Sequence, residues 1–310
     1  MAGSGVLFAG QGAQAVGMGR DLAESDPELM ALYRDADRVL GYELSRICFE
    51  GPEEELTRSN HCQPAIFVTS LVCWTALSKA LPGLTIDTAA GLSLGEWTAL
   101  HVAGALDFED ALKALEARGR YMQEACEQAD GAMVSVIGLA AAALQEISET
   151  CGVQMANINS SEQIVLSGLR SDILKAEAAA AAAGAKKTVV LNVAGAYHSR
   201  LMEPAAERLA ADLAGIPFAK TAFPVLSNVT GSPHEEPAAI REAMVRQVTQ
   251  SVNWLGCMQS MLQAGTQRFV ECGPGRVLSG LLKRVDRSVL LTNIQDLASL
   301  EKTLDVLKTE

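Results

Sequence analysis

The stretch Ala89-Ala90-Gly91-Leu92-Ser93-Leu94-Gly95-Glu96 decides the fold. Small residues lead into the pattern Gly-x-Ser-x-Gly, and a helical stretch follows through Leu100. In this pattern a serine stands on a sharp turn between a strand and a helix, and the glycines permit close backbone approach. The helix N-terminus then offers amide donors to an oxyanion. The stretch predicts Ser93 as a nucleophile, although a glycine-flanked turn with an incidental serine would match the same five residues.

Outward from this turn, strand-like apolar runs alternate with helical ones, which is typical of an α/β protein. Val6–Ala9 predicts a strand that breaks into the glycine-rich loop 10–14. The apolar spacing predicts helices over Ser25–Leu40 and Pro64–Ala80. The sequence therefore indicates a main α/β subdomain over residues 1–129 and 193–310.

A second unit is predicted between these two parts, over residues 130–192. Its runs indicate the order strand, helix, strand, strand, helix, strand, over 132–137, 140–150, 154–158, 163–167, 171–183 and 188–191. This β-α-β-β-α-β order is the ferredoxin-like plan, and about 60 residues are enough for it. We therefore expect an inserted ferredoxin-like subdomain.

Composition narrows the class of protein. The 310 residues are 49% hydrophobic and 20% charged, with a formal net charge of −12. This acidity argues against a nucleic-acid or anionic-membrane surface, and the hydrophobicity argues against disorder. The seven scattered cysteines form no C-x-x-C pair, which favours neither disulfides nor a zinc cluster and fits a reducing cytoplasm. The N-terminus has no basic region, and the chain has no run of 18 apolar residues. We therefore expect neither a signal peptide nor a membrane-spanning helix.

A serine nucleophile needs a base, and the chain has four histidines. His198 follows a loop of small residues directly after a predicted strand, which is where such bases usually lie. His101 lies two helical turns beyond Ser93 and is expected to point away. His234 is predicted to be a solvated turn residue, and His61 a capping or surface residue. His198 is therefore the best placed of the four.

Eight motifs, in order from residue 6 to about 284, together resemble the malonyl-CoA:acyl carrier protein transacylase family. They are Phe8-Ala9-Gly10-Gln11-Gly12-Ala13-Gln14, Gln63-Pro64-Ala65, Gly91-Leu92-Ser93-Leu94-Gly95-Glu96, Arg118-Gly119-Arg120-Tyr121-Met122-Gln123, Gly195-Ala196-Tyr197-His198-Ser199, Val245-Arg246-Gln247, Val252-Asn253-Trp254 and Glu271-Cys272-Gly273-Pro274-Gly275. The resemblance implies a hydrolase-like α/β subdomain that carries an inserted ferredoxin-like one, as the patterns above indicate. It also implies malonyl transfer from malonyl-CoA to the phosphopantetheine thiol of acyl carrier protein, in fatty-acid synthesis.

The resemblance also implies catalytic roles. Ser93 would carry the malonyl group as an ester in a ping-pong reaction, with His198 as its base. The backbone carbonyl of Gln247 would orient the imidazole, so that its side chain should tolerate change. The amides of Gln11 and Leu94 would form the oxyanion hole.

Substrate selection is implied for a further set of residues. Arg118 would bind the malonyl carboxylate through its guanidinium fork and so reject acetyl-CoA, although by itself the residue reads as a surface charge on a helix. Tyr197 would crowd an α-methyl group, with simple core packing as the alternative. The implied cleft is completed by Gln63, Asn157, Asn159 and Gln163, and strand-turn hydrogen bonding explains the two asparagines equally well.

Two positions depart from the family pattern. Leu92 stands where many relatives have histidine, which removes an alternative base and leaves His198 with more of the work. Ala9 replaces a frequent proline and should change only the stiffness of the loop.

Partners and cofactors follow from the same resemblance. The acyl carrier protein is acidic in this family, so docking on this acidic chain needs a local basic patch. Candidate residues are Lys186, Lys187, Arg276, Lys283 and Arg284. We expect a monomer with no metal and no redox cofactor, in which coenzyme A enters only as the carrier of the substrate.

Three other classes of protein remain. A patatin-like serine hydrolase would pair Ser93 with an aspartate, and Asp130-Gly131-Ala132 matches its short motif, although an ordinary turn explains this string. A docking module without catalysis is the second. The third, a trans-acting acyltransferase of a polyketide pathway, shares the fold and the residues.

Overall fold

The computed structural model describes residues 3–308, in which a four-stranded parallel sheet forms the centre of the larger part. The strand order is β2-β1-β7-β8, with bounds Ile86–Gly91, Ser4–Phe8, Arg268–Cys272 and Leu290–Ile294. All three pairings are parallel. Val6, Leu7 and Phe8 are fully buried, as a parallel sheet covered on both faces requires. The predicted α/β class is confirmed.

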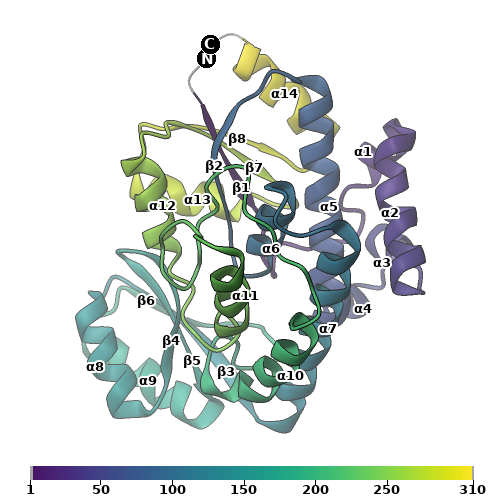
Figure 1. Ribbon diagram of the computed structural model, residues 1–310. Coiled ribbons are helices and arrows are strands. Elements are labelled where there is room, and N and C mark those ends of the chain that lie inside the picture. Colours follow the sequence, from purple (N-terminus) through teal and green to yellow (C-terminus); the bar gives the residue numbers. More distant parts are fainter. Residues whose placement is uncertain (1–2, 309–310) are drawn as a thin grey trace.

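Helices cover both faces of this sheet (Figure 1). Val6 and Phe8 pack into the core shared with α5 (Ser59–Ala80), α6 (Leu94–Val102) and α7 (Phe108–Gln128). Leu7 faces the opposite core, formed with α12 (Trp254–Gln263) and α13 (Val277–Val285). The remaining helices of this part are α1 (Arg20–Ser25), α2 (Pro27–Leu40), α3 (Leu44–Glu50), α4 (Glu53–Thr57), η1 (Arg200–Met202), α10 (Glu203–Leu213), α11 (Pro237–Arg246) and α14 (Leu297–Lys308).

One predicted helix start is wrong and another is confirmed. The helix expected from Pro64 begins at Ser59, so that the proline lies inside α5. A proline there removes the hydrogen bond to the carbonyl four residues earlier, and Tyr42 Oη donates to that carbonyl, Asn60 O, at 3.5 Å. The helix expected over about Ser25–Leu40 is confirmed as α2, which begins at Pro27 after Asp26, whose side chain accepts from the amide of Glu28 and caps the helix.

The second sheet is antiparallel, with the order β4-β5-β3-β6. Its strands are β3 (Gly131–Ile137), β4 (Gln154–Ser160), β5 (Gln163–Leu169) and β6 (Lys187–Val190), and the helices α8 (Ala141–Cys151) and α9 (Arg170–Ala182) share its core. The first strand lies between the third and the fourth, which is the ferredoxin-like arrangement predicted from sequence. This unit falls within residues 130–192, and the division of the chain into domains at those bounds stays a prediction.

The two sheets meet beside the carboxyl ends of the parallel strands. Strand β4 bonds to the segment before α12, because Ile158 N donates to Val252 O at 2.9 Å and Val252 N donates to Ala156 O at 2.8 Å. Figure 1 shows the smaller sheet below the larger one, with α11 and α10 beside the junction. Within residues 3–308, no helix combines the length and the apolar character that crossing a membrane requires.

Candidate active site

Ser93 occupies the turn between β2 and α6. Its backbone has φ 53° and ψ −104°, an uncommon conformation for a residue with a side chain. The glycines on either side allow this turn, since a Cβ on Gly91 would lie 2.0 Å from Gly95 C and one on Gly95 would lie 2.3 Å from Phe8 O. The amide of Ser93 donates to Asn228 Oδ1 at 2.7 Å. The predicted strained turn is therefore present and is held from outside by an asparagine.

His198 is the histidine that meets Ser93. Its Nε2 lies 2.9 Å from Ser93 Oγ, and its Nδ1 lies 2.8 Å from the carbonyl oxygen of Gln247. A carbonyl only accepts, so Nδ1 carries the proton and Nε2 is left to accept the hydroxyl proton of the serine. The arrangement is that of a serine with its general base, oriented by a main-chain carbonyl.

Charge and burial set the protonation of this site. Burial, with the positive charge of Arg118 second, lowers the pKa of His198 to about 4, and the bond to the Gln247 carbonyl opposes the shift. Burial also lowers the pKa of Arg118 to about 10, although the negative charge of Glu96 raises it. At neutral pH the imidazole is therefore neutral and able to accept a proton, while the guanidinium keeps its charge.

Arg118 is a buried residue of α7, only 1% exposed, and the surface-charge interpretation is wrong. Its Nη1 donates to Gln63 Oε1 at 2.6 Å, and its Nη2 donates to Ser93 Oγ at 2.9 Å and to Gln247 Oε1 at 3.0 Å. A fixed cation thus lies in hydrogen-bond contact with the serine oxygen. An anionic group on the acyl chain of a substrate would find its partner here.

The side chain of Gln247 takes part in the site, which speaks against the expectation that it should tolerate change. It is fully buried, and its Oε1 accepts from Arg118. Its Nε2 donates to Ser93 O at 3.0 Å and to Glu96 Oε2 at 2.5 Å. One residue therefore orients the base through its main chain and the cation through its side chain.

Tyr197 and Gln11 belong to a second hydrogen-bonded group. Tyr197 Oη lies 2.8 Å from Ser59 Oγ, and Gln11 Nε2 donates to both oxygens, at 3.1 Å to Ser59 and 3.4 Å to Tyr197. Gln63 Nε2 donates to Gln11 Oε1 at 3.3 Å, which links this group to Arg118. Tyr197 thus lines the cavity and its hydroxyl is hydrogen-bonded, while its effect on an α-methyl group stays a prediction.

A cavity of about 570 Å³ opens over Ser93 and His198 between the two sheets. The smaller sheet supplies polar side chains to its wall, among them Asn157, Asn159 and Gln163, and Leu92 lines the other side. Asn159 Oδ1 is buried without a hydrogen-bond partner. The cavity brings together Asn157, Asn159 and Gln163 as predicted. Gln63, the fourth predicted cleft residue, does not line it and is buried with Arg118. Leu94 is the first residue of α6, and its oxyanion role with Gln11 stays a prediction.

The other histidines do not reach the serine. His101 Nδ1 lies 2.8 Å from Leu106 O, and His61 Nδ1 lies 3.0 Å from Glu55 O. His234 is not the solvated turn residue that was predicted, because its side chain is only 2% exposed and its Nε2 lies 2.7 Å from Glu96 Oε1. The loop folds back over α6, which the sequence around His234 does not reveal.

The aspartate of the hydrolase alternative lies elsewhere. Asp130 is 74% exposed in its side chain and pairs with Arg170 at 2.8 Å, at the start of β3. Among residues 3–308, no cluster of three or more His, Cys, Asp or Glu residues could hold a metal ion. Sequence reasoning missed Asn228, Ser59 and the contacts of Glu96. Glu96 alone carried a signal, as a charged residue within an otherwise apolar stretch, whereas Asn228 and Ser59 stand among other polar residues.

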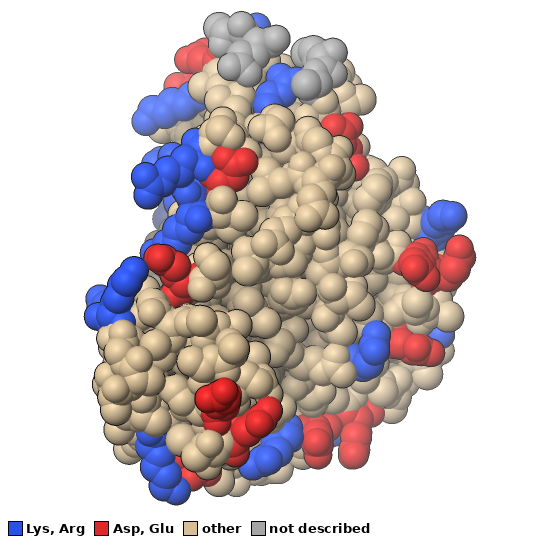
Figure 2. All heavy atoms as spheres, turned by 90° about the vertical axis from the view of Figure 1, so that its left-hand side faces the viewer, with Lys and Arg blue, Asp and Glu red and all other residues tan. Residues whose placement is uncertain are grey.

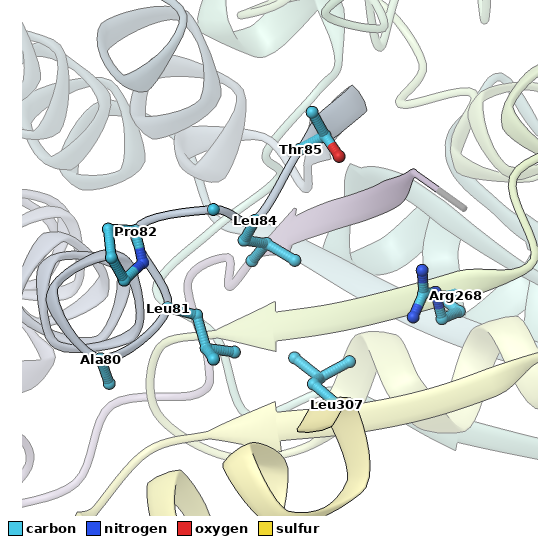
Figure 3. A pocket seen from close by; sticks show the side chains of 8 residues that line it. Ala80, Leu81, Pro82, Leu84, Thr85, Arg268 and Leu307 are labelled. Carbon is cyan, nitrogen blue, oxygen red and sulfur yellow. The ribbon is translucent and has the colours of Figure 1, made fainter. Parts of the chain in front are cut away.

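A second, smaller cavity of about 140 Å³ lies at the opposite, amino ends of the parallel strands. Leu81, Leu84 and Leu307 contribute to its wall, and Arg268 of β7 lies beside them (Figure 3). Its lining contains no histidine, cysteine or carboxylate to pair with a nucleophile. The residues suited to nucleophilic catalysis therefore lie in the cavity at the carboxyl ends of the parallel strands.

Comparison with known proteins agrees with this geometry. Residues 6–302 match the family model described as the acyl transferase domain. A malonyl CoA-acyl carrier protein transacylase of Bacillus subtilis is 38% identical over 309 residues, which cover 98% of this chain and 97% of the relative.

Solved structures give the same result. The malonyl CoA-acyl carrier protein transacylase of Clostridium perfringens superposes with a TM-score of 0.95 at 37% identity, covering 99% of this chain and 98% of that one. A malonyl-transacylase in complex with its type II PKS acyl-carrier protein superposes with a TM-score of 0.94 at 37% identity, covering 98% of this chain and 100% of that one. The chain therefore belongs to the acyl transferase family, among the malonyl CoA-acyl carrier protein transacylases.

Proposed function

We propose that the protein transfers the malonyl group of malonyl-CoA to the phosphopantetheine thiol of acyl carrier protein through an ester on Ser93. The observation that carries the proposal is the meeting of a base and a cation at one serine oxygen, each 2.9 Å away. The base makes the oxygen nucleophilic, and the cation selects an acyl group that ends in a carboxylate.

In the first half-reaction, Ser93 Oγ attacks the thioester carbon while His198 Nε2 takes the hydroxyl proton. The amides of Gln11 and Leu94 receive the oxyanion, as a helix N-terminus and a glycine-rich loop are suited to do. The carbon–sulfur bond breaks, and the leaving sulfur takes the proton from His198. In the second half-reaction the thiol of the carrier protein gives its proton to His198 and attacks the ester carbon. The bond from that carbon to Ser93 Oγ breaks, and the serine oxygen takes the proton back from His198.

Arg118 supplies the selectivity in this proposal. Its guanidinium is buried and stays charged at neutral pH, so a malonyl carboxylate gains a charge-assisted partner that acetyl cannot use. An acetyl group would leave the guanidinium without that partner. Tyr197, whose ring lines the same cavity, would limit the space for an α-methyl group.

The test is intact-protein mass spectrometry after brief incubation with malonyl-CoA, acetyl-CoA or methylmalonyl-CoA. We expect a malonyl adduct that is absent from Ser93→Ala and a much weaker acetyl adduct. Addition of carrier protein bearing its phosphopantetheine thiol should then remove the adduct and malonylate the carrier. Release of coenzyme A without any enzyme adduct, in the wild type and in Ser93→Ala alike, would refute the proposal.

The carrier protein is proposed to dock beside α13. This helix contributes Val277 and Leu281 to the cavity wall and presents the exposed cations Lys283 and Arg284 on the same element. Figure 2 shows Lys and Arg side chains gathered along one margin of the face that carries α12, α13 and α8. An acidic carrier protein would meet positive charge at the mouth of the cavity, despite the net charge of the chain.

Charge reversal tests the docking surface. Lys283→Glu should raise the KM for carrier protein, with a dependence on ionic strength, and leave malonyl-enzyme formation unchanged. Lys220→Glu, an exposed charge reversal on the loop after α10, is the matched control. An unchanged KM for carrier protein in Lys283→Glu would remove this surface from the proposal.

Fatty-acid elongation is the proposed use of the product, in a cytoplasmic monomer. A polyketide pathway is the second candidate, which the likeness to the complex with a type II PKS acyl-carrier protein favours. The kcat/KM values for a fatty-acid and a polyketide carrier protein, measured side by side, would distinguish the two uses.

A further inference from the structure

Glu96 is a buried carboxylate that the proposed reaction does not use. It lies in the first turn of α6, three residues after the nucleophile, and is fully buried. Three groups donate to it: His234 Nε2 at 2.7 Å, the amide of Asn228 at 3.1 Å and Gln247 Nε2 at 2.5 Å. The helix N-terminus and these donors together stabilise a negative charge that would otherwise be costly in the interior.

The contact with Gln247 has a chemical consequence. A side-chain amide donates through its NH₂ group and accepts through its carbonyl oxygen, and a half-turn of the amide exchanges the positions of these two groups. An ionised carboxylate only accepts, so Glu96 requires the NH₂ group of Gln247 on its own side. The carbonyl Oε1 must then face the opposite way, where it accepts from Arg118 Nη2 at 3.0 Å. Reversal of the amide would place NH₂ against the guanidinium, with donor facing donor.

The contact with His234 holds the carboxylate itself. The imidazole bonds Oε1, whereas Gln247 and Asn228 both bond Oε2, so the two oxygens have separate partners. Asn228 in turn accepts from the amide of Ser93 and donates to Gly91 O at 2.8 Å. The carboxylate thus connects a loop far along the chain to both sides of the nucleophile turn.

We propose that Glu96, held by His234, is a positioning residue that sets the orientation of the Gln247 amide and thereby aims Arg118 at the acyl group. The role rests on the proposed function, because it concerns how the carboxylate of the malonyl group is recognised. The role is one in substrate selection. A misplaced guanidinium lowers the rate of acyl-enzyme formation for an acyl group that carries a carboxylate, and it has little effect on the rate for an acyl group that has none.

The test is Glu96→Gln, which keeps the size of the side chain but gives it an NH₂ group. A glutamine offers one acceptor oxygen to the three groups that donate to Glu96, so that the Gln247 amide is no longer held by a group that only accepts. We expect kcat/KM for malonyl-enzyme formation to fall at least about tenfold, mainly through KM. Acetyl-enzyme formation, weak as it is, should change far less, so the malonyl-to-acetyl ratio falls. A merely structural role would lower both rates together and leave the ratio unchanged.

Glu271→Gln is the matched control. Glu271 of β7 is also a buried carboxylate, and it accepts from the amides of Leu278 and Ser279 at the start of α13. Its replacement should lower stability without changing the malonyl-to-acetyl ratio.

A second pair of variants keeps the proposal open to refutation if Glu96→Gln does not fold. His234→Gln keeps a donor near the position of Nε2 and should keep most of the selectivity for malonyl over acetyl. His234→Leu has no donor there and should lose that selectivity. Wild-type ratios in Glu96→Gln, or equal ratios in the two His234 variants, would overturn the inference. Absence of a malonyl adduct on the wild-type enzyme would instead overturn the proposed function, so the two failures are distinct.

Discussion

The protonation of His198 offers the sharpest test of the site. A base that works at neutral pH must be neutral there, and burial with the Arg118 charge lowers the pKa of His198 from 6.5 to about 4. The imidazole should therefore take up its proton only as the pH falls through about 4. Malonyl-enzyme formation should stay constant between pH 5 and 8, apart from effects on the substrate, and decline below that range.

The contribution of Arg118 can be separated from that of burial. Its Nη2 and the imidazole Nε2 both lie 2.9 Å from Ser93 Oγ. They are thus less than about 6 Å apart, and an effective dielectric of about 20 gives about 3 kcal/mol at about 6 Å, or about two pH units. We expect Arg118→Met to raise the pKa of His198 by about two units, to a value still below 6.5, because burial is the larger cause and remains. The bond of Nδ1 to Gln247 is retained in both proteins.

The measurement is an NMR titration of His198 in the wild type and in Arg118→Met. Ser93→Ala is not used for this comparison, because it removes a hydrogen-bond partner of the imidazole. The resonance of His198 is assigned by its loss in His198→Gln. The unfolded chain binds its proton near pH 6.5 and the native one only near 4, so this group lowers the free energy of unfolding by about 3 kcal/mol as the pH falls through that interval. A native midpoint near 6.5 would refute the reasoning, and an unshifted midpoint in Arg118→Met would show that the guanidinium does not act on the base.

Other substitutions have equally definite outcomes. Arg118→Ala should lower the rate of malonyl adduct formation about a hundredfold and that of acetyl much less, as parallel mass spectrometry would show; equal losses would contradict the carboxylate contact. Gln247→Leu should lower kcat/KM about a hundredfold although the backbone carbonyl is retained, and a wild-type rate would mean that the main chain suffices. Gly95→Ala should destabilise the protein by about 3 kcal/mol in denaturant unfolding, because a Cβ would lie 2.3 Å from a backbone oxygen. Gly215→Ala, where a Cβ meets nothing within 4 Å, should have no such effect. Tyr197→Ala should increase methylmalonyl labelling relative to malonyl, and an unchanged ratio would assign that selectivity elsewhere.

Local patterns were enough to predict much of this protein. The Gly-x-Ser-x-Gly turn was visible because the requirement for glycine at Gly91 is set by backbone atoms of Gly95, four residues later, whereas Gly95 meets Phe8 O of a distant strand. The order of the smaller unit was visible because strand and helix periods differ over a few residues. The start of α5 could not be predicted, because a proline is most common in the first turn of a helix. Only the surrounding fold permits Pro64 inside the helix.

The sequence by itself determined the fold class, the nucleophile turn and the most suitable histidine, all of which depend on residues close together in the chain. Only the tertiary structure decided that Arg118 is buried at the serine, that His234 bonds Glu96 and that the Gln247 side chain joins them. These contacts connect residues separated by 25 to 154 positions. The physical reason is that an isolated polar side chain carries no local sign of burial. Its cost in the interior is offset only by partners that folding brings from elsewhere in the chain.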